Sequence, residues 1–194
     1  DMEAAMGENS LPLWALESQD PVKNFDMIAF TIGYEMAYSN VLNMLNLAGV
    51  PLRSKDRPGL KNIVFAGGVC AFNPEPLADF IDFFSLGEGE DITVEILQLY
   101  DRAKAERWSK DAFLHEAAKI PGVYVPSFYR HEYNADGTLA AIVPLEGVPQ
   151  TVTKRIIEDL DNAYFPTKMI VPSTEIVHDR ANLEVFRGCI RGCR

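Results

Sequence analysis

The sequence is poor in cysteine, histidine and tryptophan, and it contains no long hydrophobic run. Only three cysteines and three histidines occur among its 194 residues. An odd number of cysteines argues against a disulfide framework and is typical of a reducing compartment. No segment approaches the roughly twenty apolar residues that a transmembrane helix requires. The first residues, DMEAAMGENS, also lack the charged and then apolar pattern of an export signal. We therefore expect a cytoplasmic protein with no membrane partner.

Basic residues are scarce as well. The 18 lysines and arginines are outnumbered by 28 aspartates and glutamates, which leaves a net charge of −10. No run of basic residues resembles those that follow a phosphate backbone. We therefore expect no direct binding of nucleic acid. Because 47% of the residues are hydrophobic, the chain can form one globular domain of ordinary size and an appendage.

Apolar runs alternate with helical patterns in the first half of the chain. The runs end on glycine or on paired glycines, and the helical segments repeat apolar residues at a spacing of three to four. This alternation implies a parallel sheet covered by helices, and therefore an α/β fold. The pattern predicts strands at 27–33, 62–68 and 81–87 and helices at 34–48, 74–80, 90–107 and 109–119.

The second half of the chain has a different pattern. The runs GVYVPSFYRHEY and TLAAIVPLEG, joined by NADG, predict two antiparallel strands and a turn. A proline-punctuated connector follows, in which we expect a short helix at 153–160, and NLEVFRG at 182–188 predicts a final strand. The expected organisation is an α/β domain over 1–120, a hairpin extension and connector over 121–175, and the start of a further domain over 176–194.

Small residues follow each of the three predicted strands. In parallel α/β sheets, ligands bind beyond the carboxyl ends of the strands, where small residues let a cofactor approach backbone N–H groups. Alternatively, each glycine only forms a tight turn between strand and helix, and an acid there only favours the first turn of the next helix. The candidate cofactor-binding residues are Thr31, Gly67, Gly68, Gly87, Glu88 and Gly89.

Two cysteines, Cys189 and Cys193, stand close together after the last predicted strand. Gly188 and Gly192 would let this loop fold around a metal group, and iron–sulfur clusters take thiolate ligands from such closely spaced cysteines. A zinc site would need a second pair of ligands, and Cys70 is expected to be a small buried residue. The residues alone leave two interpretations open: a cluster-binding loop and an incidental pair of thiols.

Several segments resemble a known family. The stretch IVFAGGVCAFNPEPLADFIDFFSLGEGED is similar to the cobalamin-binding-type domain that precedes the barrel of radical S-adenosylmethionine (SAM) enzymes. LEVFRGCIRGCR is similar to the strand and loop that open this barrel, whose motif is C-x₃-C-x₂-C. The resemblance covers nearly the whole chain. Within this family, the chain looks most like a subfamily often labelled Fe–S oxidoreductase. It implies a Rossmann-like parallel sheet flanked by helices, with a hairpin extension and the first strand of a radical SAM barrel.

The resemblance also implies a chemistry for the parent enzyme. Radical SAM enzymes hold a [4Fe–4S] cluster through three cysteines and cleave SAM to make a 5′-deoxyadenosyl radical. Cys189 and Cys193 match the first two ligands, and the third would stand three residues beyond Cys193. We therefore expect the chain to be the N-terminal portion of a longer enzyme. Its partner would be the rest of the same polypeptide, and it would be inactive alone.

Cobalamin is a further cofactor that the resemblance allows. Such domains often supply a cobalt-ligating histidine from a D-x-H-x-x-G motif, which this sequence lacks, and His115, His131 and His178 are expected to be surface or structural residues. Thr31 stands where many cobalamin domains have the serine of an S-x-L motif, with Gly33 in place of the leucine. A vestigial domain and a flavodoxin-like nucleotide-binding or interaction module are the alternatives.

Overall fold

The computed structural model describes two compact units. They comprise Asp1–Ile156 and Ile157–Arg194. Among the described residues, no helix has the length and apolar character needed to cross a membrane. The description covers residues 2–168, 171, 174–177, 180 and 183–192.

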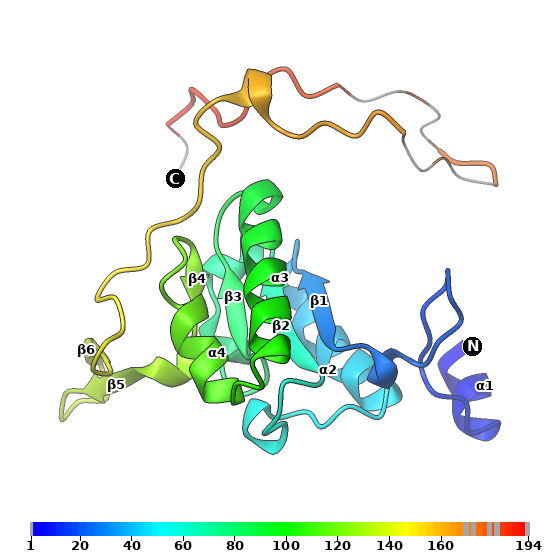
Figure 1. The fold of residues 1–194 in the computed structure, drawn as a ribbon, viewed down its shortest axis with the longest axis horizontal. Helices are drawn as coiled ribbons and strands as arrows, with labels where there is room; N and C mark the ends of the chain where they lie inside the picture. The colour runs from blue at the N-terminus through cyan, green and yellow to red at the C-terminus, as the bar shows by residue number, and fades with distance from the viewer. Residues whose placement is uncertain (1, 169–170, 172–173, 178–179, 181–182, 193–194) are drawn as a thin grey trace. The chain divides into compact units, whose positions relative to one another are not determined.

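Four strands form the main sheet of the first unit, in the order β1-β2-β3-β4 (Figure 1). They are β1 (Met27–Thr31), β2 (Ile63–Gly67), β3 (Phe83–Ser85) and β4 (Val123–Tyr124). The first three strands are parallel, as predicted, and β4 is antiparallel to β3. The sequence had placed the residues of β4 in the hairpin. The single strand predicted from GVYVPSFYRHEY is divided at Pro126, which begins a 3₁₀ turn and has no N–H to donate to a strand.

The helices of the first unit agree with the prediction except at two places. They are α1 (Met2–Glu8), α2 (Tyr38–Leu47), α3 (Gly89–Ala105) and α4 (Lys110–Ala117). No prediction covered α1, and the helix expected at 74–80 is only a 3₁₀ turn. The described residues form 3₁₀ turns at Val22–Asn24, Glu35–Ala37, Ser54–Asp56, Val69–Phe72, Glu75–Leu77, Pro126–Phe128 and Leu160–Asn162.

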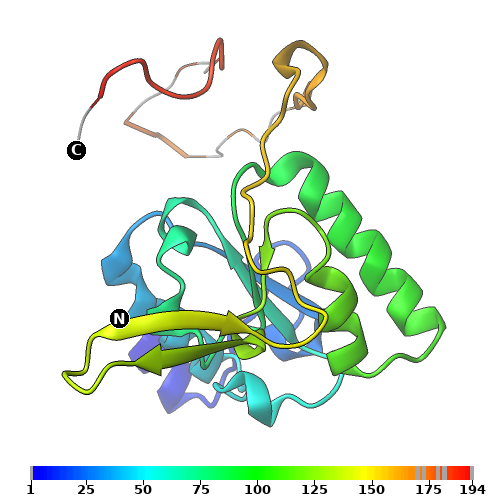
Figure 2. The same ribbon diagram turned by 90° about the vertical axis from the view of Figure 1, so that its left-hand side faces the viewer.

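Hydrophobic clusters cover both faces of the main sheet. Successive residues of a strand point to opposite faces, and accordingly Phe83 packs with α3 and α4 whereas Phe84 packs with α2. The rings of Phe65 and Phe83 stack at a centroid distance of 4.9 Å on the first of these faces. Helices therefore lie on both sides of the sheet, as Figure 2 shows. The central strand β2 is apolar along its whole length because both of its faces are covered, whereas Ala29 and Thr31 of the edge strand β1 are exposed.

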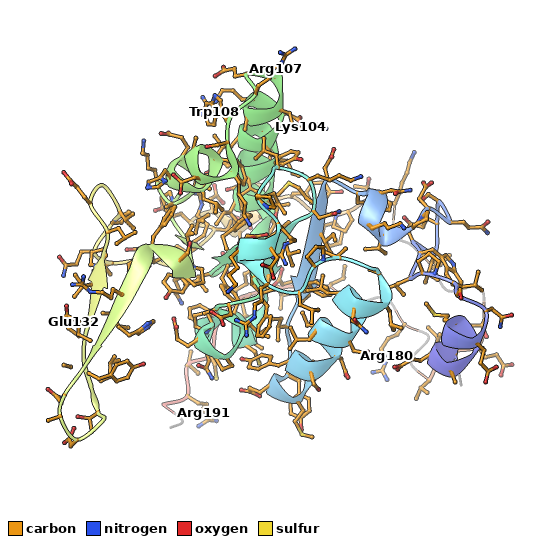
Figure 3. The ribbon with its side chains drawn as sticks, turned by 90° about the horizontal axis from the view of Figure 1, so that it is seen from below. Lys104, Arg107, Trp108, Glu132, Arg180 and Arg191 are labelled. Atoms are coloured by element: carbon orange, nitrogen blue, oxygen red, sulfur yellow. The ribbon has the colours of Figure 1, made fainter. Side chains whose placement is uncertain are left out.

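The antiparallel hairpin predicted from the sequence is confirmed. It consists of β5 (Tyr129–Tyr133) and β6 (Leu139–Pro144), which form a separate two-stranded sheet. In its turn, the N–H of Thr138 donates to Asp136 at 3.0 Å, and Gly137 has a φ of +83°. Figure 3 shows Glu132 on this hairpin, which projects away from the body of the first unit.

Two sequence predictions in the last third of the chain are wrong. The segment predicted as a helix at 153–160 is extended up to Ile156, because Arg155 pairs with a strand end instead, and only a 3₁₀ turn begins at Leu160. The strand predicted at 182–188, as the first strand of a barrel, is absent over the described residues 183–188. A strand needs a neighbour to pair with, and none of the described residues pairs with this segment.

A buried carboxylate joins two strands to the loops at their amino ends. Asp82 lies directly before β3 and is only 1% exposed. Its carboxylate accepts hydrogen bonds from the backbone N–H of Val64 at 2.6 Å, from the Arg57 guanidinium at 3.1 Å and from the Ser54 hydroxyl. The ammonium of Lys110 forms an ion pair with it at 2.6 Å. These contacts connect β2, β3, the loop before β2 and the first turn of α4.

The guanidinium of Arg57 extends this network to three backbone carbonyls. It donates to Pro51 at 2.6 Å, to Leu52 at 2.8 Å and to Phe80 at 2.6 Å. A buried charge is tolerated only when partners replace the water that it has lost. The Asp82 network therefore fixes the path of the chain directly before β2 and directly before β3.

Replacing Asp82 by asparagine is expected to destabilise the protein strongly. Asp82→Asn keeps the side-chain size but leaves the buried cations Arg57 and Lys110 without a counter-charge. We expect a loss of about 3–5 kcal/mol in the free energy of unfolding, measured by urea denaturation. The matched control is Asp79→Asn, because Asp79 is 69% exposed in its pair with Arg53, and its loss should be below about 1 kcal/mol. Equal losses in the two variants would contradict this assignment.

Candidate functional site

The strands β1, β2 and β3 end at one edge of the sheet, the carboxyl edge, and three predicted site residues meet there. Thr31 pairs with Gly67, and a Cβ on Gly67 would lie 3.4 Å from the backbone oxygen of Ser85. Gly68 has a φ of +93°, and a Cβ there would lie 2.7 Å from the carbonyl oxygen of Ile32. Close packing of β1 on the end of β2 therefore requires glycine at position 68. A role of these residues in binding a cofactor stays a prediction.

The end of β3 is crossed by a segment from later in the chain. Gly87 forms a parallel β-bridge with Arg155. The N–H of Arg155 donates to the carbonyl of Leu86 at 2.8 Å, and the N–H of Glu88 donates to the carbonyl of Arg155 at 3.0 Å. We call residues 153–156 the strap. The strap thus lies at the carboxyl edge, where the sequence predicted a ligand.

Steric contacts explain the glycines beside the strap. Gly87 has a φ of +105°, and a Cβ there would lie 2.0 Å from the carbonyl oxygen of Arg155. Gly122 has a φ of +94°, and its Cβ would lie 3.1 Å from the backbone nitrogen of the same residue. The Arg155 side chain also forms an ion pair with Glu95 of α3 at 2.5 Å. The backbone of the strap therefore fills the space beside Gly87 that a cofactor would need.

The remaining two predicted residues of this edge lie where α3 begins. Gly89 is the first residue of α3, and Glu88 precedes it in an extended conformation. A Cβ on Gly89 would meet only the Thr93 hydroxyl, at an ordinary 3.7 Å. The structure thus places Glu88 against the strap and Gly89 in the first turn of α3. Both residues follow Gly87 directly in the chain.

The predicted metal ligands fall in the second unit. Cys193 lies outside the described residues, and Cys189 is exposed. Gly188 has a φ of +88°, and the N–H of Arg191 donates to the Sγ of Cys189 at 3.4 Å. Cys70 is buried beside the sheet, where desolvation raises the pKa of its thiol and makes it a poor ligand. Among the described residues, no three His, Cys, Asp or Glu side chains gather to hold a metal ion.

Both described histidines have partners away from the carboxyl edge. The ring of His115, on α4, lies 4.2 Å from the ring of Phe128. His131, on β5, lies 3.3 Å from the carboxylate of Glu75. His178 lies outside the described residues. This agrees with the expectation that the described histidines are structural or surface residues.

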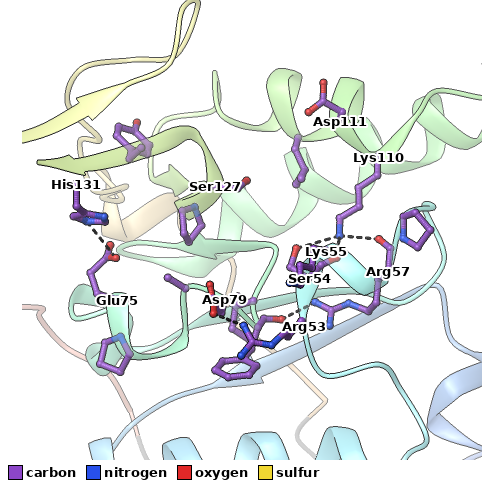
Figure 4. A pocket seen from close by; sticks show the side chains of 18 residues that line it. Arg53, Ser54, Lys55, Arg57, Glu75, Asp79, Lys110, Asp111, Ser127 and His131 are labelled. Carbon is purple, nitrogen blue, oxygen red and sulfur yellow. Dashed lines mark hydrogen bonds and ion pairs between the residues drawn. The ribbon is translucent and has the colours of Figure 1, made fainter.

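A cleft of about 820 Å³ lies near the amino ends of β2 and β3 (Figure 4). Its walls come from the loop before β2, the β2–β3 connection, the start of α4 and the base of the hairpin. Sequence reasoning missed this site. The signal was Asp82, because a carboxylate within an apolar strand run needs a buried cation elsewhere in the chain. The charged residues that line the cleft are Arg53, Lys55, Arg57, Glu75, Asp79, Lys110, Asp111 and His131.

Comparison with known proteins identifies the family. Residues 1–126 match the model of a family described as radical SAM proteins, N-terminal. The chain belongs to this family. This radical SAM N-terminal domain is also similar to an uncharacterized protein of Methanocaldococcus jannaschii, with 27% identity over 187 residues. The alignment covers 94% of the chain but 32% of the relative, so the chain spans about a third of that protein's length. No solved structure matches the chain significantly.

The residues at the end of β3 do not fit a bound cobalamin. The backbone of the strap lies against Gly87, which the sequence placed in the cofactor site. Neither His115 nor His131 lies at the carboxyl edge, so neither of these histidines is placed to ligate cobalt there.

The steric role of Gly87 is testable by substitution. In Gly87→Ala the methyl group would collide with the backbone of the strap, whereas in Gly137→Ala it would meet open space at a similarly positive φ. We expect urea denaturation to show that Gly87→Ala costs about 1–3 kcal/mol more than Gly137→Ala. Limited proteolysis should also cleave the strap faster in Gly87→Ala alone. If the two variants lose the same stability, the contact with the strap does not require the glycine.

Hydroxocobalamin offers a direct test of the fit. We expect its absorption spectrum to stay unchanged when the chain carrying Cys189→Ala and Cys193→Ala is added in excess, because the strap covers the end of β3. The two substitutions remove thiols that would ligate cobalt directly. Free imidazole, which ligates cobalt, provides the positive control for the spectral change. A shifted corrin spectrum that persists through gel filtration of the chain would refute this expectation.

Proposed function

We propose that this chain is the N-terminal domain of a radical SAM enzyme and that Cys189 is the first thiolate ligand of its [4Fe–4S] cluster. The observation that supports this most directly is the match of residues 1–126 to the radical SAM N-terminal family. The Cys189–Cys193 pair follows that region at the C-x₃-C spacing. On this proposal the first unit serves the enzyme as a folded domain in front of the catalytic one.

The surroundings of Cys189 suit a cluster ligand. Its thiol is exposed, so it is free to meet a metal group. The Arg191 N–H donates to its Sγ at 3.4 Å, and such hydrogen bonds to sulfur stabilise a thiolate and tune the potential of a cluster. The positive φ of Gly188 turns the chain directly before the ligand. These features favour a cluster loop over an incidental pair of thiols.

The proposal needs a partner, which is the rest of the same polypeptide. Two cysteines leave a [4Fe–4S] cluster short of protein ligands, and the relative is about three times as long as the aligned region, since the alignment covers 32% of it. When bound, the cluster would supply the electron for the reductive cleavage of SAM. Cys189 of this chain would hold one side of the cluster.

Anaerobic reconstitution with iron and sulfide tests the proposal. We expect residues 1–194 alone to retain no stoichiometric four-iron cluster, and the natural polypeptide that contains them to retain one. In that polypeptide, Cys189→Ala should lose the cluster, measured as iron and sulfide per chain and by visible absorption.

The matched control for this experiment is Cys70→Ala. Cys70 is buried beside the sheet, so its removal should leave the cluster content unchanged. Full iron content in Cys189→Ala would refute the assignment of Cys189. A stable four-iron cluster in residues 1–194 alone would refute the need for a partner, and would favour a self-contained metal domain.

A further inference from the structure

The cleft at the amino ends of the strands is a second candidate site, and its charges are unevenly distributed. Figure 4 shows the His131–Glu75 pair at one end of the cleft and Lys110 at the other, with its side chain directed at Ser54 and Arg57. The Asp82 network underlies the second end. The balance of charge there decides which ligand the cleft favours.

The geometry around Lys110 requires a charged ammonium group. Its Nζ lies 2.7 Å from the carbonyl of Ser54, 2.9 Å from the carbonyl of Arg57 and 2.6 Å from the carboxylate of Asp82. The Ser54 hydroxyl is a fourth acceptor, at 3.1 Å. Four acceptors engage every N–H of the amine, and only the protonated amine has three. Burial lowers the pKa of Lys110, and the nearby Asp82 carboxylate opposes this shift. The hydrogen bonds therefore hold Lys110 in its cationic form.

The buried network consequently carries one more positive than negative charge. Arg57 is cationic at all relevant pH values, and its side chain is 1% exposed. Its Nε is buried without a hydrogen-bond partner among the described residues. Asp82 is a single carboxylate between two cations, Arg57 and Lys110. An uncompensated buried charge next to an open cleft favours a counter-ion in that cleft.

The surface of this end of the cleft adds to the positive charge. Lys55 is exposed and has no ion-pair partner among the described residues. The Arg53 guanidinium lies over the ring of Phe80 at 5.6 Å and pairs with Asp79. Three acids line the cleft. Asp79 is neutralised by Arg53, and the carboxylate of Glu75 accepts from the hydroxyl of Tyr124 at 2.6 Å at the far end. Asp111 follows Lys110, and its carboxylate lies 3.3 Å from the ring of His115.

From these contacts we infer that the cleft binds the anionic group of a small ligand, a carboxylate or a phosphate, at the end formed by Lys55, Arg57 and Lys110. The exposed ammonium of Lys55 would make the direct contact. Arg57 and Lys110 donate to protein acceptors and would act on the anion through their charge. The acids elsewhere in the cleft disfavour ligands with several negative charges, so the site fits one anionic group. The net charge of −10 would repel anions from the rest of the protein. This site is independent of the cluster and of Cys189.

Inorganic phosphate and acetate are the probes that test this inference. At constant ionic strength set with chloride, each is titrated into the chain while backbone amide NMR shifts are followed. We expect saturable shifts confined to residues of the cleft, and a higher midpoint of urea unfolding in the presence of the bound anion. Saturation by both anions indicates a site for either group, and saturation by one alone assigns the site to that group. No saturable shift with either anion would overturn the inference.

Two charge-reversal variants separate the cleft from the general surface. Lys55→Glu should weaken binding of the anion about tenfold or more, since an acid would face the site. Lys61→Glu changes the net charge equally at an exposed position outside the cleft, and its affinity should stay within about twofold of that of the unmodified chain. Equal losses in the two variants would assign the effect to overall charge and refute the site. Both residues are exposed, so both variants should fold.

Discussion

The carboxylate of Asp82 is the interaction on which the first unit depends. It lies among apolar side chains at the start of β3, where a charge is tolerated only with partners of opposite sign. Arg57 comes from the loop before β2 and Lys110 from the start of α4, so two distant segments are fixed by one group. Ion pairs as well as apolar packing therefore hold α4 and the loop before β2 against the start of β3.

This network also gives an acidic protein a local region of positive charge. The excess of acids in the sequence predicts a surface that repels anions. This prediction holds for exposed charges, whose effect is screened by water and salt. Arg57 and Lys110 are buried, so their charge is screened less and acts mainly on the adjacent cleft. Net charge alone therefore does not describe what this protein binds.

The parallel sheet was predictable from the sequence because β2 and β3 are largely buried on both faces. The runs at 62–68 and 81–87 are almost wholly apolar, and their order with the helices implies a common carboxyl edge. β4 was missed because it is two residues long and Pro126 separates it from β5. The strap was missed because it has a single bridge to a distant residue, and no local periodicity marks such a contact.

The glycines of the carboxyl edge show why a sequence pattern supports two interpretations. A ligand that approaches the backbone and a chain segment that crosses it both exclude a Cβ, so glycine at position 87 is equally compatible with each. The structure places Arg155 there. Only β3 (Phe83–Ser85) separates Asp82 at one edge of the sheet from Leu86, which holds the strap at the other. The Asp82 network beside the anion cleft and the strap that leads out of the first unit are thus connected through one short buried strand.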